Sequence, residues 1–147
     1  MDLDLIKLNV KANSSEDVIR LLGKEMKKKD YVKSGYIDAV LAREAILPTG
    51  LNLNDFGVAI PHTDTQYVNK ASIGVAVLSK PIKFNNMINP KEKIQVQLVF
   101  LLAIQDPSNQ VQLLQKLMAV FQNIDLLKLI QKATTKEEIA NKLQHIF

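Results

Sequence analysis

The spacing of apolar residues predicts helices at both ends of the chain and strands in its middle. Apolar residues recur at helical intervals between positions 18 and 26, directly after a run of small capping residues at 13–17. This pattern predicts a helix that ends at about Lys29. A second helix is predicted from Ser34 to Pro48, with Ile37, Val40 and Leu41 on one face.

The middle of the chain carries the pattern of strands. Residues 3–10 alternate between apolar and polar, and 58–60 and 72–78 are short apolar runs that we expect to stop at Pro61 and Pro81, because proline has no N–H for a ladder. Residues 94–104 become continuously apolar, which is typical of a central strand covered on both faces. A buried helix is the alternative there, but the β-branched and aromatic content favours a strand. Residues 48–50, 52–55 and 84–93 carry turn signals.

Helices are predicted again after residue 105. Asp106 followed by Pro107 is typical of a helix start, a short helix is predicted over 124–130, and Thr135 with Glu138 fits a capping box. The final helix would turn Ile139, Leu143 and Ile146 inward. Helices, then strands, then helices predict an α/β sandwich in which helices flank both faces of a mixed sheet, formed by a single domain over residues 1–147.

Composition narrows the class of protein. The chain has 147 residues, of which 47% are hydrophobic and 23% charged, as in ordinary globular domains. It has no apolar run of membrane-spanning length, and its acidic start predicts no secretory signal. The absence of cysteine excludes disulfides and thiolate chemistry and fits a cytoplasmic protein. With a net charge of +4 and 5% aromatic residues, no nucleic-acid partner is expected.

Candidate chemistry centres on His62, one of two histidines. Metal-ligand spacings, a serine-hydrolase elbow, a P-loop and a dinucleotide fingerprint are all missing from the sequence, so we expect neither a metal nor a cofactor. His62 follows the strand that stops at Pro61, and a polar pair follows it. An imidazole whose pKa is near about 6.5 is largely neutral at pH 7. The natural reaction of a lone histidine nucleophile is to accept and pass on a phosphoryl group.

Phosphoryl transfer also requires hydrogen-bond donors and positive charge around the phosphoryl oxygens. Arg43 is one of only two arginines in a lysine-rich chain, and its planar fork suits phosphate. The backbone N–H groups of Ser108, Asn109 and Gln110 would form an anion site if their helix points at His62. That meeting requires the strands before His62 and before residue 105 to be parallel.

Three segments together resemble a known family. Arg43-Glu44, Pro48-Thr49-Gly50-Leu51 and the run from Gly57 to Asp64, in this order and spacing, resemble the enzyme IIA domain of the fructose–mannitol class of the bacterial sugar phosphotransferase system. Within the class, Thr63-Asp64 after the histidine resembles the galactitol-type branch.

The resemblance implies a phosphohistidine mechanism. His62 would accept phosphate on Nε2 from the phosphocarrier protein HPr, with Nδ1 hydrogen-bonded to hold the ring. It would then pass the phosphoryl group to a cysteine of a sugar-specific enzyme IIB during uptake of a sugar alcohol, galactitol in this branch. The membrane permease, enzyme IIC, would be only an indirect partner. A regulatory domain of the nitrogen type, which signals by binding partners, and a small-molecule-binding module with a structural histidine are the alternatives.

The resemblance also carries roles for the neighbours of His62. Arg43 matches the arginine beside the family's site, whereas Gln110, with Asn109 adjacent, stands where many members have a second histidine. An amide donates a hydrogen bond but cannot gain charge. Thr49 either contacts the phosphoryl group or forms a turn, and Asp64 either orients the ring or faces solvent. An apolar docking patch is expected around His62, with Phe56 and Val111 as candidates.

Overall fold

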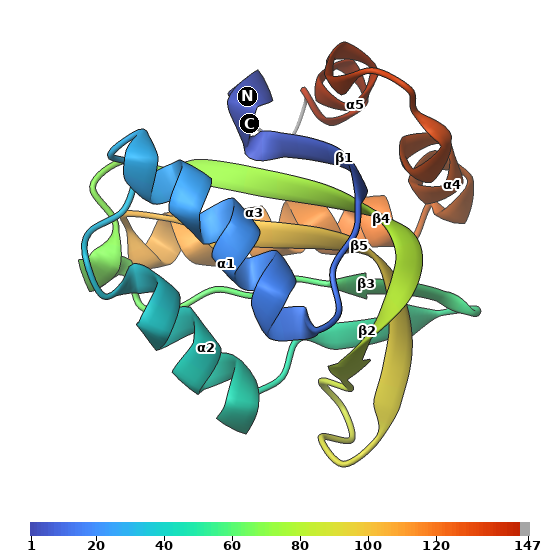
Figure 1. Ribbon diagram of the computed structural model, residues 1–147, viewed down its shortest axis with the longest axis horizontal. Helices are drawn as coiled ribbons and strands as arrows, with labels where there is room; N and C mark the ends of the chain where they lie inside the picture. Colours follow the sequence, from blue (N-terminus) through green and yellow to red (C-terminus); the bar gives the residue numbers. More distant parts are fainter. Residues whose placement is uncertain (145–147) are drawn as a thin grey trace.

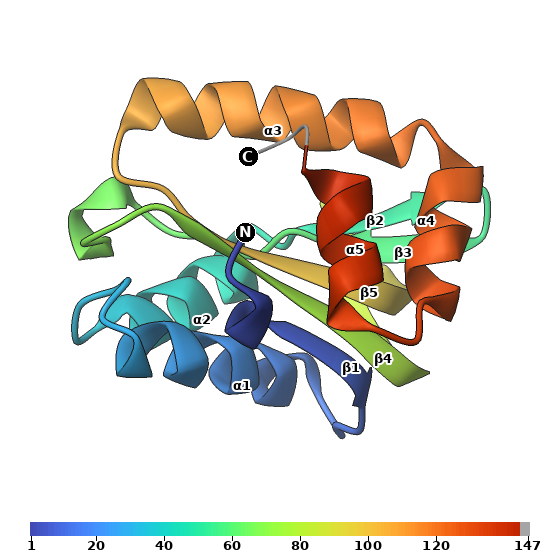
Figure 2. The same ribbon diagram turned by 90° about the horizontal axis from the view of Figure 1, so that it is seen from above.

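The computed structural model describes residues 1–144 and forms a mixed sheet between two layers of helices (Figure 1). Helices α1 (Ser15–Lys28) and α2 (Tyr36–Ile46) cover one face. The other face is covered by α3 (Pro107–Phe121), α4 (Ile124–Lys132) and α5 (Lys136–Leu143), as Figure 2 shows from above. The predicted α/β sandwich with helices on both faces is therefore confirmed.

The five described strands lie in the order β1-β4-β5-β3-β2. Their bounds are Ile6–Val10 for β1, Gly50–Leu53 for β2, Phe56–Ala59 for β3, Ser72–Asn85 for β4 and Lys93–Ala103 for β5. Strands β3 and β5 are parallel, as are β1 and β4, whereas the β2–β3 and β4–β5 pairs are antiparallel. Because β3 and β5 are parallel, the segments that follow them leave the sheet at the same edge.

Side chains of the central strands alternate between the two layers. On β5, Phe100 and Leu102 pack against α3 to α5, whereas Val99 and Leu101 pack under α1 and α2. All four are buried, as the continuous apolar run predicts.

The predicted helix caps are present. Ser14 Oγ accepts the Asp17 N–H at 3.2 Å, and Thr135 Oγ1 accepts the Glu138 N–H at 3.2 Å. These bonds satisfy backbone donors that a helix start otherwise leaves unpaired. The capping residues therefore allow both helix starts to be predicted to within a few residues. Leu143 is buried as predicted, whereas Ile146 lies outside the described residues.

Residues 50–53 form strand β2 instead of the predicted loop. Leu53 pairs with Phe56, so β2 and β3 are joined by the two-residue turn Asn54-Asp55. Both turn residues have positive φ, 50° and 66°, which is the backbone of a tight hairpin turn. Asn54-Asp55 was predicted as part of a loop, but the pair forms the turn of a hairpin.

Two strand boundaries also differ from the prediction. Strand β4 continues past Pro81 to Asn85, with a register shift between Val77 and Ile82, and pairing with β1 ends at Leu78. Pro81 therefore lies where the ladder is already irregular and needs no N–H. At the N-terminus, residues 3–5 form a 3-10 turn because the Asp2 carboxylate accepts the Asp4 N–H, and β1 begins only at Ile6.

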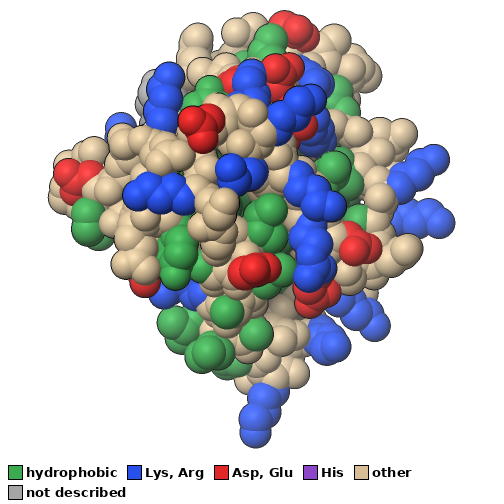
Figure 3. All heavy atoms as spheres, turned by 60° about the vertical axis from the view of Figure 1, so that its left-hand side comes forward, with side chains coloured by type: hydrophobic (Ala, Val, Ile, Leu, Met, Phe, Trp, Pro, Cys, Tyr) green, Lys and Arg blue, Asp and Glu red, His purple; other side chains and the backbone are tan. Residues whose placement is uncertain are grey.

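On the face shown in Figure 3, basic and acidic side chains lie interspersed with hydrophobic ones. Lys24, Lys27 and Lys28 at the end of α1 are exposed, and Lys29 forms ion pairs of 2.7 Å with Asp2 and with Asp4. None of the helices in the described part of the chain is long and apolar enough to cross a membrane.

Candidate functional site

His62 lies just beyond strand β3, at the edge where β3 and β5 both end. Pro61 cannot donate to a ladder, but its carbonyl accepts the Leu102 N–H at 3.0 Å, which holds the chain against β5 for one more residue. His62 then turns away with a partly buried ring, and its Nδ1 lies 2.8 Å from the Ile60 carbonyl oxygen. A carbonyl only accepts, so Nδ1 carries the hydrogen and Nε2 of the neutral ring keeps its lone pair.

The surroundings favour the neutral form of this ring. Burial lowers the pKa of His62 below its ordinary value, and the charge of Arg43 lowers it further, against opposing effects of the Ile60 carbonyl and of Asp64. Desolvation penalises the charged imidazolium, so it outweighs the acceptor bond. The lowered pKa favours the neutral ring, in which Nε2 carries the nucleophilic lone pair.

Thr49 and Glu44 form a hydrogen-bonded unit behind the histidine. The Glu44 carboxylate accepts the Thr49 N–H at 2.8 Å and the Thr49 hydroxyl at 2.7 Å. Thr49 Oγ1 in turn accepts the Ile60 N–H at 3.2 Å, and Thr49 is only 3% exposed. Burial raises the pKa of Glu44, which the bonds from Thr49 and the charge of Arg43 partly offset. A hydroxyl has one hydrogen, and in Thr49 that hydrogen is directed to Glu44.

Arg43 lies close enough for its charge to act on both His62 and Glu44. Its Nε is buried and has no acceptor among residues 1–144. A buried donor without a partner is costly, so an acceptor that reached this nitrogen would be bound favourably.

Helix α3 reaches the same site through its first turn. Gln110 Nε2 donates to the Thr63 carbonyl at 3.2 Å, which ties α3 to the residue after His62. Asn109 is exposed and lines a neighbouring groove with Ile73 and Lys116. Gln110 therefore lies beside the His62 loop, and its contact with a phosphoryl group stays a prediction.

The predicted anion site at the backbone N–H groups of α3 is wrong, because these donors are already hydrogen-bonded to Asp106. The Ser108 N–H donates to Asp106 Oδ1 at 2.8 Å, the Gln110 N–H donates to the Asp106 carbonyl at 3.0 Å, and the Asn109 N–H also contributes to a lowered pKa of the Asp106 carboxyl. The capping aspartate already occupies the donors that we expected to be free, because a carboxylate is itself the anion that a helix start binds best.

Two further expectations concern the surroundings of the ring. Asp64 is exposed, and the acceptor of the hydrogen bond from Nδ1 is the Ile60 carbonyl and not the Asp64 carboxylate.

Of the two docking-patch candidates, Val111 is 56% exposed, but Phe56 is 4% exposed and belongs to the core. Phe56 packs into the core from β3, so the prediction that it forms part of an exposed docking patch is wrong.

Glu44 is the residue of this site to which sequence reasoning gave no role. Its signal was present in the pair Arg43-Glu44 and in a threonine five positions after the acid, a spacing that lets a carboxylate at a helix end accept the N–H and the hydroxyl of that threonine. Among residues 1–144, no group of three or more histidine, cysteine, aspartate or glutamate side chains is arranged to hold a metal ion.

This fold and this histidine site match a described family. The model of the family "Phosphoenolpyruvate-dependent sugar phosphotransferase system, EIIA 2" matches residues 1–146. The chain therefore belongs to the type-2 enzyme IIA family, whose members are phosphotransferase components that carry a phosphohistidine.

Two proteins from Escherichia coli are similar to this chain over most of its length. The chain is 32% identical over 147 residues to the PTS system 2-O-alpha-mannosyl-D-glycerate-specific EIIABC component, and the match covers 95% of this chain. It spans only 21% of that longer relative. It is 29% identical over 112 residues to the PTS system galactitol-specific EIIA component, covering 76% of this chain and 74% of that protein.

Solved structures share the fold at low sequence identity. The enzyme IIAMTL in a complex with phosphorylated enzyme IIBMTL from Escherichia coli aligns with a TM-score of 0.79 at 21% identity, covering 99% of this chain and 97% of that one. The nitrogen regulatory protein IIA-Ntr from Neisseria meningitidis aligns with a TM-score of 0.77 at 21% identity, covering 97% and 94%. Both solved structures thus share the fold of this chain.

Proposed function

We propose that this chain carries a phosphoryl group on Nε2 of His62, accepting it from phospho-HPr and passing it to a cysteine of a sugar-specific enzyme IIB. The observation that carries the proposal is the 2.8 Å contact between His62 Nδ1 and the Ile60 carbonyl, which leaves Nε2 as the free nucleophile. The proposed transport substrate is a sugar alcohol, galactitol, on the basis of the galactitol-specific relative.

Each transfer is a displacement at phosphorus. The Nε2 lone pair attacks the phosphorus of the phosphohistidine in HPr, the donor P–N bond breaks, and its electron pair returns to the donor imidazole. In the second step, the IIB thiolate attacks phosphorus and the new P–N bond breaks, returning its pair to Nε2. Throughout, Nδ1 keeps its hydrogen, and Arg43 stabilises the charge of the phosphoryl oxygens, since its buried Nε has no other acceptor within residues 1–144.

Contact with two successive partners requires accessible apolar surface near the histidine. Val111 follows Gln110 and is 56% exposed, and Ile46 and Leu47 follow Arg43 at 74% and 54%. Large exposed apolar side chains beside a reactive group support docking of a protein partner there.

The first test is phosphorylation from labelled phosphoenolpyruvate with the two upstream phosphotransferase proteins. We expect stoichiometric labelling of the wild type and of His145→Gln, which replaces the other histidine, and none of folded His62→Gln. Labelling of His62→Gln would overturn the proposal.

The second test is delivery to acceptors. A galactitol-specific IIB should remove the label, whereas mannitol-specific and mannosyl-glycerate-specific IIB proteins should be slower acceptors. The alternative is a regulatory domain, which the shared fold of the nitrogen regulatory protein supports; it would be labelled on His62 but would deliver the label to none of these IIB proteins.

A further inference from the structure

We propose that Glu44 and Thr49 are positioning residues for His62: together they fix the Ile60 carbonyl that selects which ring nitrogen is the nucleophile. This inference rests on the proposed function of His62. It assigns Thr49 a role behind the ring instead of at the phosphoryl group, and it gives Glu44 a role that the sequence alone did not indicate.

The four residues form one continuous chain of hydrogen bonds. Both Glu44 oxygens accept from Thr49, at 2.8 Å from its N–H and at 2.7 Å from its hydroxyl. Because the hydroxyl hydrogen is used there, Oγ1 is an acceptor toward the Ile60 N–H, at 3.2 Å. Ile60 then presents its carbonyl to His62 Nδ1 at 2.8 Å. Backbone N–H groups only donate and the carbonyl only accepts, so the one direction that Glu44 sets is that of the Thr49 hydroxyl.

The Ile60 carbonyl is held from both sides along the backbone. On one side Thr49 binds the Ile60 N–H, and on the other the Pro61 carbonyl accepts the Leu102 N–H at 3.0 Å. The carbonyl between these two anchors cannot rotate without breaking one of them. Pro61 adds rigidity, since its ring fixes φ directly after the carbonyl.

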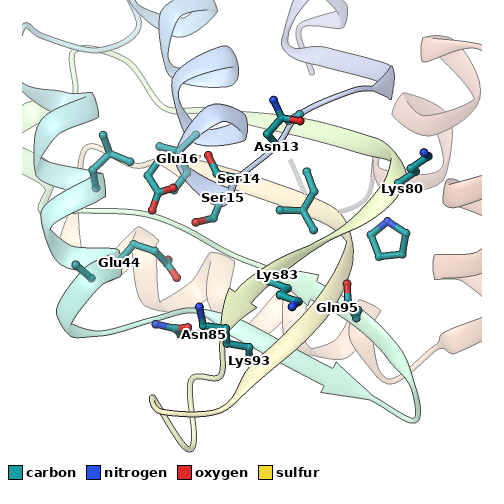
Figure 4. Close-up of a pocket in the computed structure, with 16 residues that line it drawn as sticks. Asn13, Ser14, Ser15, Glu16, Glu44, Lys80, Lys83, Asn85, Lys93 and Gln95 are labelled. Atoms are coloured by element: carbon teal, nitrogen blue, oxygen red, sulfur yellow. The ribbon is translucent and has the colours of Figure 1, made fainter.

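A charged Glu44 is costly at this position. Burial raises the pKa of Glu44, so its charged form is disfavoured there. Glu44 projects from α2 toward a cavity whose opposite wall carries Lys83, Asn85 and Lys93 (Figure 4). No hydrogen bond to these side chains is found in residues 1–144, so the carboxylate is committed to Thr49.

The consequence is a defined tautomer. With the carbonyl fixed, the neutral ring is protonated at Nδ1 and attacks through Nε2. With the carbonyl released, the ring gains the other tautomer and other orientations, and a reacting nitrogen displaced by about 1 Å can lose on the order of 100-fold in rate.

The test compares three variants at and behind Thr49. Thr49→Val removes the hydroxyl, Thr49→Ser keeps it, and Glu44→Gln replaces one acceptor oxygen by a donor. Thr135→Val is the matched control, because Thr135 makes a similar pair of bonds with Glu138 in the capping box of α5. Nitrogen-15 NMR reads the tautomer of the unphosphorylated His62 ring, and phosphorus-31 NMR reads which nitrogen carries phosphate.

We expect Thr49→Val and Glu44→Gln to give a mixture of ring tautomers and at least about a 10-fold slower phosphorylation, from the loss of orientation. Thr49→Ser should restore the wild-type tautomer and rate, and Thr135→Val should leave both unchanged. If Thr49→Val does not fold, the ring tautomer and the phosphorylation rate of Glu44→Gln test the same inference.

Two results separate this inference from the proposed function, and the first of them would overturn it. Wild-type tautomer and rate in both Thr49→Val and Glu44→Gln would exclude positioning, even if His62 is phosphorylated. A wild type that takes no label while these variants still shift the tautomer would support the positioning and exclude the carrier function.

Discussion

Two regions converge on His62, and they are built in opposite ways. The β2–β3 region brings Thr49 and Ile60 to the histidine through buried bonds in which each donor and acceptor is used. The first turn of α3 brings Gln110 there on an exposed helix end that is satisfied by its own capping residue, Asp106. The first region fixes the ring, and the second contributes one side-chain bond of 3.2 Å. We therefore expect changes in the first region to cost more than changes in the second.

The largest effect is expected at Gly57 in β3. A Cβ at this position would lie 1.8 Å from the Gln95 carbonyl oxygen of β5, so Gly57→Ala must displace backbone. We expect a loss of about 3 kcal/mol or more in the free energy of unfolding, measured by urea denaturation.

Gly74→Ala is the matched control, because a Cβ there meets side chains of Leu22 and Met26 only at 3.4–3.5 Å, an ordinary contact. Equal stability of the two alanine variants would contradict the close packing of β3 against β5.

Replacement of Arg43 should give the next largest effect, on transfer and not on stability. Arg43→Gln removes both charge and fork, and a lost hydrogen bond to a charged oxyanion is worth roughly 1.5–3 kcal/mol, or about 10- to 150-fold in the rate of phosphorylation. Arg43→Lys should recover part of this loss, since it keeps the charge.

The comparison for Arg43 is Arg20→Gln, which changes the other arginine, exposed on α1. A phosphorylation rate for Arg43→Gln within twofold of that for Arg20→Gln would contradict a role for Arg43 in the transfer.

Loss of the α3 cap should cost moderate stability. Asp106→Ala leaves the Ser108 N–H without its 2.8 Å acceptor, and a lost N-cap costs about 1 kcal/mol. Asn123→Ala, which removes the cap of α4, should cost a similar amount in the same urea titration. If phosphorylation slows more than tenfold in Asp106→Ala but not in Asn123→Ala, α3 positions the His62 site more strongly than we expect.

The smallest kinetic effect is expected at Gln110. Gln110→Ala removes the bond to the Thr63 carbonyl, and a neutral hydrogen bond contributes about 0.5–1.5 kcal/mol net. Phosphorylation should slow only by about 2- to 10-fold, whereas Gln112→Ala on the exposed side of the same helix should change nothing. A loss as large as that of Arg43→Gln would contradict the minor contribution that we expect from the first turn of α3.

The pH dependence of His62 follows from its lowered pKa. Burial lowers the pKa, so the unfolded chain binds more protons than the folded chain as pH falls below about 6.5. The contribution of His62 to stability is therefore complete above that pH and decreases as the solution becomes more acidic. NMR titration of the ring should give a midpoint below that of a model peptide; a midpoint above it would contradict the burial argument.

The sequence by itself determined the helices, the layer architecture and the candidate nucleophile. Caps such as Ser14 and Thr135 act within one turn, and apolar periodicity is a property of neighbouring residues, so both can be read locally. Asn54-Asp55 carried a local signal too, but the hairpin it forms was identified only when β2 was seen to pair with β3.

Only the tertiary structure decided what surrounds the histidine. The bond between Gln110 and Thr63 joins residues 47 positions apart, and the parallel pairing of β3 with β5 has no local signal. That Asp106 occupies the donors of α3, and that Glu44 and Thr49 fix the Ile60 carbonyl, depends on which groups burial leaves without water. Hydrogen-bond partners inside a protein are assigned by packing, because a buried polar group must bind whichever complementary group the fold brings within reach.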